Sequence, residues 1–105
     1  MFGELKNKKR YILCRVRSSS SSIDAAILYS AIMNKTLELY GWSGKAITGL
    51  RVWQLKDRQG HFVLRCSLRG LPHVLTSTTL LTSINHERVA IDVLRISGTI
   101  KSLLG

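Results

Sequence analysis

The sequence predicts an α+β fold in which a four-stranded antiparallel sheet carries two helices on one face and a short C-terminal helix. Three observations support this class. Four segments show the apolar/polar alternation of half-buried strands, two segments repeat apolar residues at helical spacing, and turn residues separate them. With 45% hydrophobic residues in a chain of 105, there is enough apolar material for one core, so residues 1–105 are expected to form a single domain.

The first strand is expected over Lys9–Val16, and five consecutive serines after it form the loop into a helix. Ser21 and Asp24 have the spacing of a capping box, in which a hydroxyl and a carboxylate satisfy the free N–H groups of a helix start. The helix is expected to continue to about Tyr40, with Gly41 as its C-terminal stop.

A hairpin follows, in which strands over Ala46–Lys56 and His61–Leu68 are joined by a turn at Asp57–Gly60. Apolar residues at helical spacing and Pro72 in the first turn predict a helix over Leu71–Ile84, although four threonines lower its helix propensity. The chain then ends with two more elements, a strand over Arg88–Ser97 and a short helix over Ile100–Leu104. This β-α-β-β-α-β order is that of a ferredoxin-like (RRM-like) sandwich.

Each of the four predicted strands carries an arginine on the side opposite the core, and these are Arg15, Arg51, Arg65 and Arg95. In this topology the first and third strands are central neighbours, so Arg15 and Arg65 are expected close together, with Arg51 and Arg95 towards the edges. Guanidinium groups are costly to bury and pair well with phosphate, so this open face is expected to meet a polyanion.

Apolar residues also fall on the open side of the alternation, and they are too many for a purely electrostatic surface. Alternation in the last strand puts Ala90, Leu94 and Ile96 towards the core, with Asp92 as an exception. The apolar residues then left on the open face are Leu13, Trp53, Val63, Ile91 and Val93. They predict a cover: the terminal helix, a protein partner, or both.

The formal net charge of +10 concerns partners and not the fold. Nucleic acid is the favoured partner of such a small basic domain, and a membrane surface is the second alternative. No secretory signal and no membrane span are expected, because the N-terminus is polar and basic and the longest uncharged stretch is rich in Ser and Thr. Cys14 and Cys66 lie on the apolar side of their strands, so we expect buried, reduced thiols in a cytosolic or nuclear protein.

An active site is not apparent in the sequence. The acids are scattered, no glycine-rich phosphate loop occurs, and neither cysteine nor histidine spacing fits a metal site, so no catalytic or metal-binding residue is predicted. The base-stacking pattern of an RNA recognition motif also fails, because the third strand has Gly60 and Arg65 at the two stacking positions. Phosphate contacts are therefore favoured over base reading.

Three segments, KKRYILCRV from Lys8, LRCSL from Leu64 and RISGTIKSLL from Arg95, resemble the small α/β protein subunit of archaeal and eukaryotic ribonuclease P, the Pop-five/Rpp-fourteen type. The resemblance covers nearly the whole chain. It implies a non-catalytic subunit of the ribonucleoprotein that removes 5′ leaders from precursor tRNA. The RNA does the chemistry with Mg²⁺, and the protein binds no cofactor itself. The implied partners are the ribonuclease P RNA, a TIM-barrel protein subunit, a second copy or a related small subunit, and precursor tRNA indirectly. Family members generally carry more helix after the Gly-Thr turn than is present here.

The expected RNA contacts are basic residues of the N-terminal run, the central strands and the terminal helix: Lys6, Lys8, Lys9, Arg10, Arg15, Arg65 and Lys101. The cytoplasm is the expected location if the source is archaeal, and the nucleus or nucleolus if it is eukaryotic. Two alternatives stay open at this point. One is an RNA-binding module of the same fold in another ribonucleoprotein, such as a ribosomal protein; the other is a small acylphosphatase-like enzyme.

Overall fold

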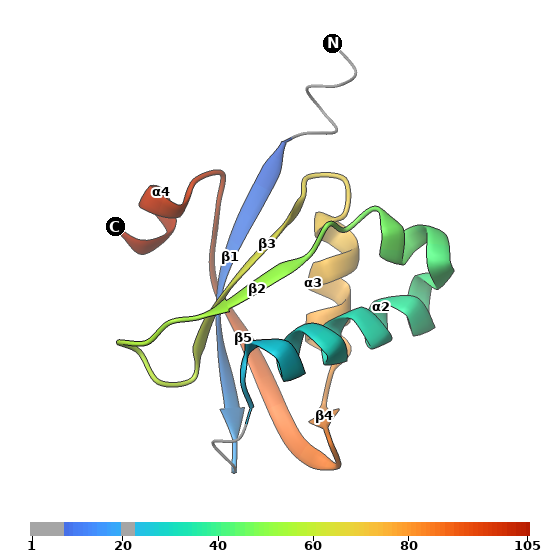
Figure 1. Cartoon of the computed structure of the whole chain (residues 1–105), viewed down its shortest axis with the longest axis horizontal. Helices are drawn as coiled ribbons and strands as arrows, with labels where there is room; N and C mark the ends of the chain where they lie inside the picture. The colour runs from blue at the N-terminus through green and yellow to red at the C-terminus, as the bar shows by residue number, and fades with distance from the viewer. Residues whose placement is uncertain (1–7, 20–22) are drawn as a thin grey trace.

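An antiparallel sheet with helices on both faces forms the molecule (Figure 1). The computed structural model describes residues 8–19 and 23–105. Within them the elements are β1 (Lys9–Ser18), α2 (Ala25–Ala46), β2 (Arg51–Gln54), β3 (His61–Ser67), α3 (Leu71–Leu80), β4 (Ser83–Ile84), β5 (Glu87–Ser97) and α4 (Ile100–Leu104). The sheet order is β2-β3-β1-β5-β4. The α+β class is confirmed, and the two-residue β4 makes five strands where four were predicted.

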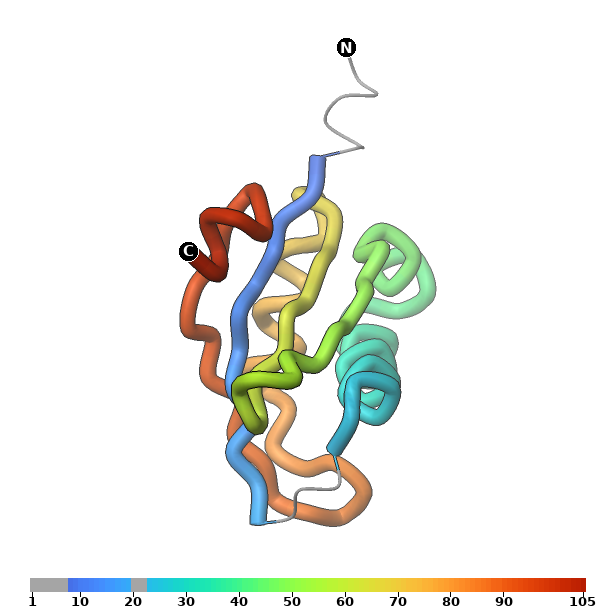
Figure 2. The backbone as a smooth tube through the Cα atoms, turned by 60° about the vertical axis from the view of Figure 1, so that its left-hand side comes forward, coloured from blue at the N-terminus to red at the C-terminus, as the bar shows by residue number. Residues whose placement is uncertain are grey.

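The main core lies between the sheet and the helices α2 and α3. From the sheet, Ile12, Leu64 and Phe62 are essentially inaccessible to solvent, and α2 and α3 bury their own apolar stripes against them. The buried helix residues of this core are Leu28, Ile32, Met33 and Val74. This layer leaves the opposite face of the sheet to α4 (Figure 2).

A β-bulge in the pairing of β1 with β5 changes the faces predicted for the last strand. Leu13 pairs with Arg95 but Cys14 pairs with Val93, so one residue, Leu94, has no partner on β1. In the part of β5 that precedes Leu94, the side chains therefore point to the faces opposite to those predicted, because the prediction assumed an unbroken alternation along the whole strand.

The inward placement of Ala90 was accordingly wrong, as was the open-face placement of Ile91 and Val93. Ile91 pairs with Val16 and packs against the main core, and Val93 shares the face of Cys14. Asp92, the predicted exception among inward residues, faces Arg15 on the open side.

α2 begins at Ala25, later than the predicted capping box implies, and continues beyond its predicted end. The Asp24 carboxylate accepts a hydrogen bond of 2.8 Å from the N–H of Ile27 and caps the helix; Ser21 of the predicted capping box lies outside the described residues. Gly41 was predicted to stop the helix, but it is a kink, with φ 73° and ψ −171°, and helix resumes to Ala46. The hairpin strand is correspondingly shorter than the predicted 46–56.

α3 forms despite its threonines, and the hydroxyls of Thr78 and Thr79 find acceptors within the helix. The Thr78 Oγ1 donates to the carbonyls of Val74 and Leu75, each at 2.9 Å. The helix ends earlier than predicted because Leu81 is extended, with φ −80° and ψ 108°. The residues after it turn into β4 instead of continuing to Ile84 as helix.

α4 lies across the face of the sheet opposite α2 and α3 (Figures 1 and 2). Its Leu103 is 1% exposed and packs on Leu13 and Val63. Thr99 caps it by accepting a 3.1 Å hydrogen bond from the Ser102 N–H. The predicted cover of the open face is therefore confirmed for the terminal helix.

Candidate nucleic-acid interface

The four strand arginines do share the open face. Arg51 pairs with Arg65, and Arg95 pairs with Leu13, whose side chain is on the side of α4. Arg15 pairs with His61, four residues before Arg65 on β3. Four positions along a strand amount to about 13 Å, so the predicted proximity of Arg15 and Arg65 was wrong. The near neighbours are Arg51 and Arg65.

Arg15 lies in an ion-pair cluster around one carboxylate. The Asp92 Oδ2 accepts from Arg15 Nη2 at 3.1 Å and from Arg17 Nε at 2.8 Å. Hydrogen bonds from Arg17 and then Arg15 hold the pKa of Asp92 below its usual range, and the same contact raises the pKa of Arg17. Because the cluster is exposed, its contribution to stability is small, but it removes one positive charge from this part of the face.

Arg65 has a different environment on the central strand β3. Its guanidinium carbon lies 5.7 Å from the centroid of the Trp53 ring, within cation–π range. Its buried Nε has no hydrogen-bond partner among the described residues. A buried charged donor without a hydrogen-bond acceptor lowers the stability of the fold, so packing alone does not explain the position of this side chain.

α4 takes up the centre of the face. The Arg95 Nη1 donates to the carbonyls of Ser102 and Leu103 at 3.3 and 3.2 Å, satisfying groups at the C-terminal end of α4. Leu13 and Val63, two of the predicted partner contacts, are buried under it. Trp53 remains 40% exposed, so of the predicted open-face apolar residues it is the one that lies on this face and stays accessible.

A group of basic residues lies where β1 begins and where β3 and β5 end. The Leu68 N–H donates to the Lys8 carbonyl at 3.0 Å, which brings the turn after β3 beside the start of β1. Arg10 Nη1 donates to the Lys9 carbonyl at 2.8 Å and lies beside Gly98, just before α4. We call this end of the sheet the basic end; it carries Lys8, Lys9, Arg10, Arg51, Arg65, Arg69 and Lys101. Lys6, also a predicted contact, lies outside the described residues.

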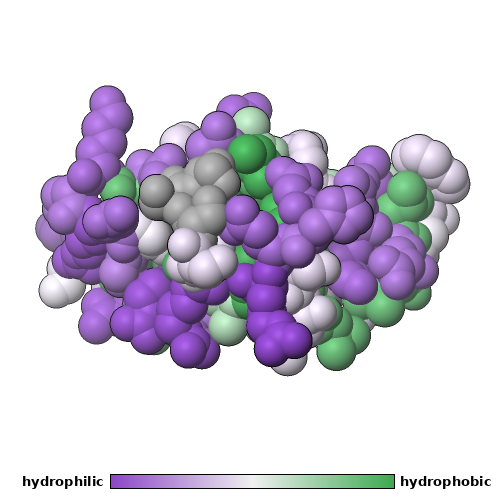
Figure 3. All heavy atoms as spheres, turned by 90° about the horizontal axis from the view of Figure 1, so that it is seen from below, coloured by the Kyte–Doolittle hydropathy of each residue, from purple (hydrophilic) through white to green (hydrophobic). Residues whose placement is uncertain are grey.

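The described acids lie elsewhere. Asp57 is in the β2–β3 turn, Glu87 begins β5 and Asp24 caps the start of α2, all at the opposite end of the strands. Asp92 is neutralised by arginines, and Glu38 pairs with Lys35 on α2. Figure 3 looks at the molecule from below, towards that opposite end, where hydrophilic side chains cover most of the surface. In the described chain, therefore, the basic end has no acidic neighbour in its strands and turns.

Both cysteines are buried on the core face, as predicted. Burial raises the pKa of Cys14 to about 12 and that of Cys66 to about 11. Cys14 pairs with Phe62, four residues from Cys66, which is too far for a disulfide. Over residues 8–19 and 23–105, no three His, Cys, Asp or Glu side chains cluster as metal ligands, and no helix is long and apolar enough to cross a membrane.

A family comparison tests the resemblance that the sequence showed. The model of the Rpp14/Pop5 family matches residues 10–104 of this chain. The chain belongs to the Rpp14/Pop5 family. Membership accounts for the resemblance to ribonuclease P protein subunits that the three sequence segments indicated.

Individual relatives agree with this placement. The Ribonuclease P protein component 2 of Pyrococcus furiosus is 34% identical over 101 residues, covering 94% of this chain and 82% of its own length. The protein of the same name from Methanosphaerula palustris is 33% identical over 99 residues, again 94% of this chain. This chain spans 61% of the length of the Methanosphaerula protein.

Among solved structures, a chain in the cryo-EM structure of yeast ribonuclease MRP has the same fold. The TM-score is 0.66 at 15% identity, covering 88% of this chain and 75% of the other. At that identity the likeness concerns the fold of this Rpp14/Pop5-family chain alone.

Arg51 and Arg69 belong to the basic end but were not among the predicted RNA contacts. The prediction placed Arg51 towards the edge of the sheet, away from Arg65, because the sequence does not show which residue of β3 pairs with it. Arg69 follows directly after β3, in the turn beside Lys8. A sequence signal for Arg69 does exist, since a basic residue just after a central strand adjoins the start of an antiparallel neighbour.

Proposed function

We propose that this Rpp14/Pop5-family chain is a non-catalytic protein subunit of ribonuclease P that binds the catalytic RNA and stabilises it for removal of the 5′ leader from precursor tRNA. The observation that carries the proposal is the basic end, where seven cations from three strands, the adjoining segments and α4 lie without a described acidic neighbour. The names of the two relatives, protein components of ribonuclease P, support it.

The chemistry of such a subunit is electrostatic. Lysine and arginine side chains neutralise RNA phosphates and release their counterions, so RNA segments that repel each other can pack closely. The RNA supplies the reactive centre with Mg²⁺, and the protein lowers the Mg²⁺ concentration needed for folding. Among the proposed contacts, Lys8 and Lys101 are exposed and without an ion pair in the described chain, so they suit this role directly.

Protein partners belong to the same proposal. The accessible Trp53 beside Arg65 is the proposed contact for the TIM-barrel subunit, and a second copy or a related small subunit is a further candidate partner. The proposed location follows that of the RNA: cytoplasm in an archaeal source, nucleus or nucleolus in a eukaryotic one.

Reconstitution tests this function. The protein is mixed with a ribonuclease P RNA and the TIM-barrel subunit, and cleavage of precursor tRNA is measured at limiting Mg²⁺. We expect the protein to lower the Mg²⁺ requirement. Cleavage that is indifferent to the protein over the whole Mg²⁺ range would overturn the proposal.

A matched pair of variants locates the contact. In Lys8→Gln/Lys101→Gln, the slope of log affinity for the RNA against log salt concentration should become shallower by about two, since each phosphate contact contributes about 0.9. The control, Lys56→Gln/Arg58→Gln, removes the same charge from the exposed β2–β3 turn at the opposite end. Equal losses in both variants would show that net charge, and not the basic end, governs binding.

A further inference from the structure

A groove beside the last turn of α2 combines aromatic and cationic side chains. It has a volume of about 400 Å³, within the range of small-molecule sites. Its walls come from α2 and from the segment that leads into β2. The residues that line it include Tyr29, Trp42, Lys45 and Arg51, and none of its lining residues is acidic.

Trp42 is the most exposed large hydrophobic residue of the described chain, at 73%. The kink at Gly41 places it there, and the backbone angles of that glycine belong to a region that residues with a Cβ avoid. The Lys45 Nζ lies 5.0 Å from the centroid of the Trp42 ring. An indole held beside a cation and left open to solvent contributes little to the core, which points to a ligand.

Positive charge surrounds this indole on the side of the sheet. Arg51 lies on the edge strand β2, where it lines the groove, and it pairs across the strands with Arg65, so the groove adjoins the basic end. Lys9 adds a third cation, since its Nζ would lie 3.9 Å from a Cβ placed on Gly49, another residue of the groove.

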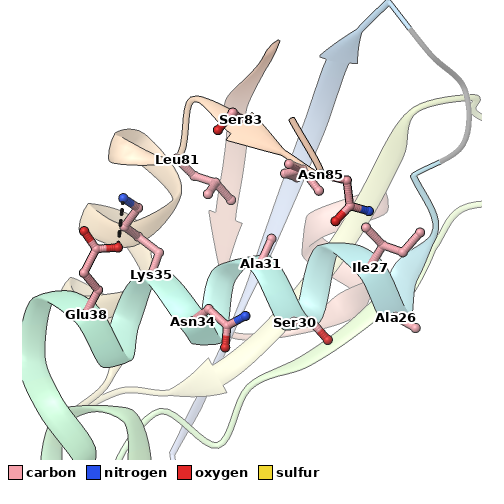
Figure 4. Close-up of a pocket in the computed structure, with 11 residues that line it drawn as sticks. Ala26, Ile27, Ser30, Ala31, Asn34, Lys35, Glu38, Leu81, Ser83 and Asn85 are labelled. Carbon is pink, nitrogen blue, oxygen red and sulfur yellow. Dashed lines mark ion pairs between the residues drawn. The ribbon is translucent and has the colours of Figure 1, made fainter. Parts of the chain in front are cut away.

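A second groove lacks this combination of an aromatic ring and free cations. Between α2 and the segment Leu81–Asn85, short side chains such as Ala31 leave about 550 Å³ (Figure 4). Its single cation, Lys35, is held by Glu38 at 3.4 Å, and no aromatic ring lines it. It offers neither a stacking surface nor a free positive charge.

We propose that the groove at Trp42 binds an unpaired nucleotide of RNA, with the base stacked on the indole and the flanking phosphates paired with Lys45 and Arg51. The inference rests on the proposed function and deepens it by naming a single-stranded element as part of the RNA contact. Aromatic rings alternating with cations are the general means of holding single strands, because every base has a face to stack while the backbone is uniformly negative. A duplex keeps its bases stacked and cannot offer one.

Indole fluorescence provides a direct test. In a Trp53→Phe background, Trp42 is the single indole of the chain. A short oligoadenylate should quench its emission, whereas an abasic oligomer of equal length and charge should bind without quenching. Trp42→Leu should weaken oligoadenylate binding about tenfold at every salt concentration, since stacking is insensitive to salt. Lys45→Gln should instead make the salt slope shallower by about one.

Leu39→Ala is the matched control, because it shortens another exposed apolar side chain of α2 outside the groove. Equal quenching by the abasic oligomer, or unchanged oligoadenylate affinity in Trp42→Leu, would overturn the inference. So would a Trp42→Leu variant that loses the TIM-barrel subunit but keeps the oligonucleotide, since Trp42 would then be a protein contact. None of these results touches the reconstitution test, so the two proposals fail separately.

Discussion

At the scale of single residues, one carboxylate determines how much positive charge the arginines of β1 present on the open face. Asp92 accepts hydrogen bonds from both Arg15 and Arg17, and these hold its pKa low. Since the pKa is lowered in the folded state, the pairing is fully present above the unfolded value of about 3.9 and is lost as pH falls through the lower folded value. At neutral pH the two arginines therefore share one counter-charge.

Asp92→Asn is expected to tighten RNA binding and to make its salt dependence steeper by up to about two, because both arginines become available to phosphate. Titrating the RNA at several salt concentrations measures both quantities. Asp57→Asn, in the exposed β2–β3 turn, serves as the control for loss of a negative charge. Unchanged affinity in Asp92→Asn would remove Arg15 from the proposed contacts.

The two thiols give a second prediction at this scale. Because burial raises both pKa values above the ordinary range, the reactive thiolate is scarce, and we expect Cys14 and Cys66 to resist alkylation in the native protein at pH 8. Mass spectrometry should show no added label until denaturant unfolds the chain, and then two. Rapid labelling of the native protein would mean that the core opens readily.

At the scale of elements, alternation predicted which segments are strands better than which way each side chain points. β1 and β3 keep a strict period of two, so the faces of Arg15, Arg51 and Arg65 were predicted correctly. The bulge at Leu94 leaves no mark in the composition of β5, and it reversed the faces of Ile91 and Asp92.

Site geometry was harder to predict than the fold because it depends on which residues lie opposite each other. The sequence showed which residues are basic and predicted that the open face of the sheet is covered, but it did not show that Arg51 pairs with Arg65. Trp42 was missed as well, since a glycine at the end of a helical pattern predicts a stop, and here Gly41 turns the helix instead.

Gly41→Ala should therefore lower the free energy of unfolding by about 1–3 kcal/mol, because alanine is strained at φ 73° and ψ −171°. Chemical denaturation measures the change. Ser43→Ala, at an exposed position two residues on, should stay within about 0.5 kcal/mol of the parent. If alanine at 41 were neutral, the kink would not be held by the surrounding structure.

The docking of α4 can be tested in the same way. Leu103→Ala removes the side chain that covers Leu13 and Val63, and a loss of about 2 kcal/mol is expected, at the low end for buried leucines because a terminal helix can detach. Leu104→Ala is the control, since its side chain is 37% exposed and should change stability by less than about 0.5 kcal/mol. Similar losses of stability in both variants would argue against specific packing of Leu103 on the sheet.

At the scale of the whole molecule, the described acids gather towards one end of the strands, so net positive charge is concentrated at the other end. The β-hairpin turn and the starts of α2 and β5 hold Asp57, Asp24 and Glu87, whereas the strand ends beside α4 hold the basic end. This separation arises from topology, because neighbouring strands run in opposite directions and bring residues distant in sequence to the same end.

Lysine footprinting tests whether the RNA binds at the basic end. With ribonuclease P RNA bound, acetylation of Lys8, Lys9 and Lys101 should fall several-fold, while Lys35 and Lys56 should react as in the free protein. Peptide mass spectrometry of the two samples gives the ratio for each lysine. Uniform protection of all five would contradict a localised interface.

The separation of charge also has a kinetic consequence. Cations lie at both ends of the strands but the described acids lie towards one end only, so the net positive charge is concentrated at the basic end and gives the molecule a dipole moment along the strands. In the field of an RNA this dipole exerts a torque, so the protein turns its basic end forward during diffusion, before any contact forms. Productive encounters then become a larger share of all collisions, and assembly is accelerated by the distribution of charge as well as by its amount.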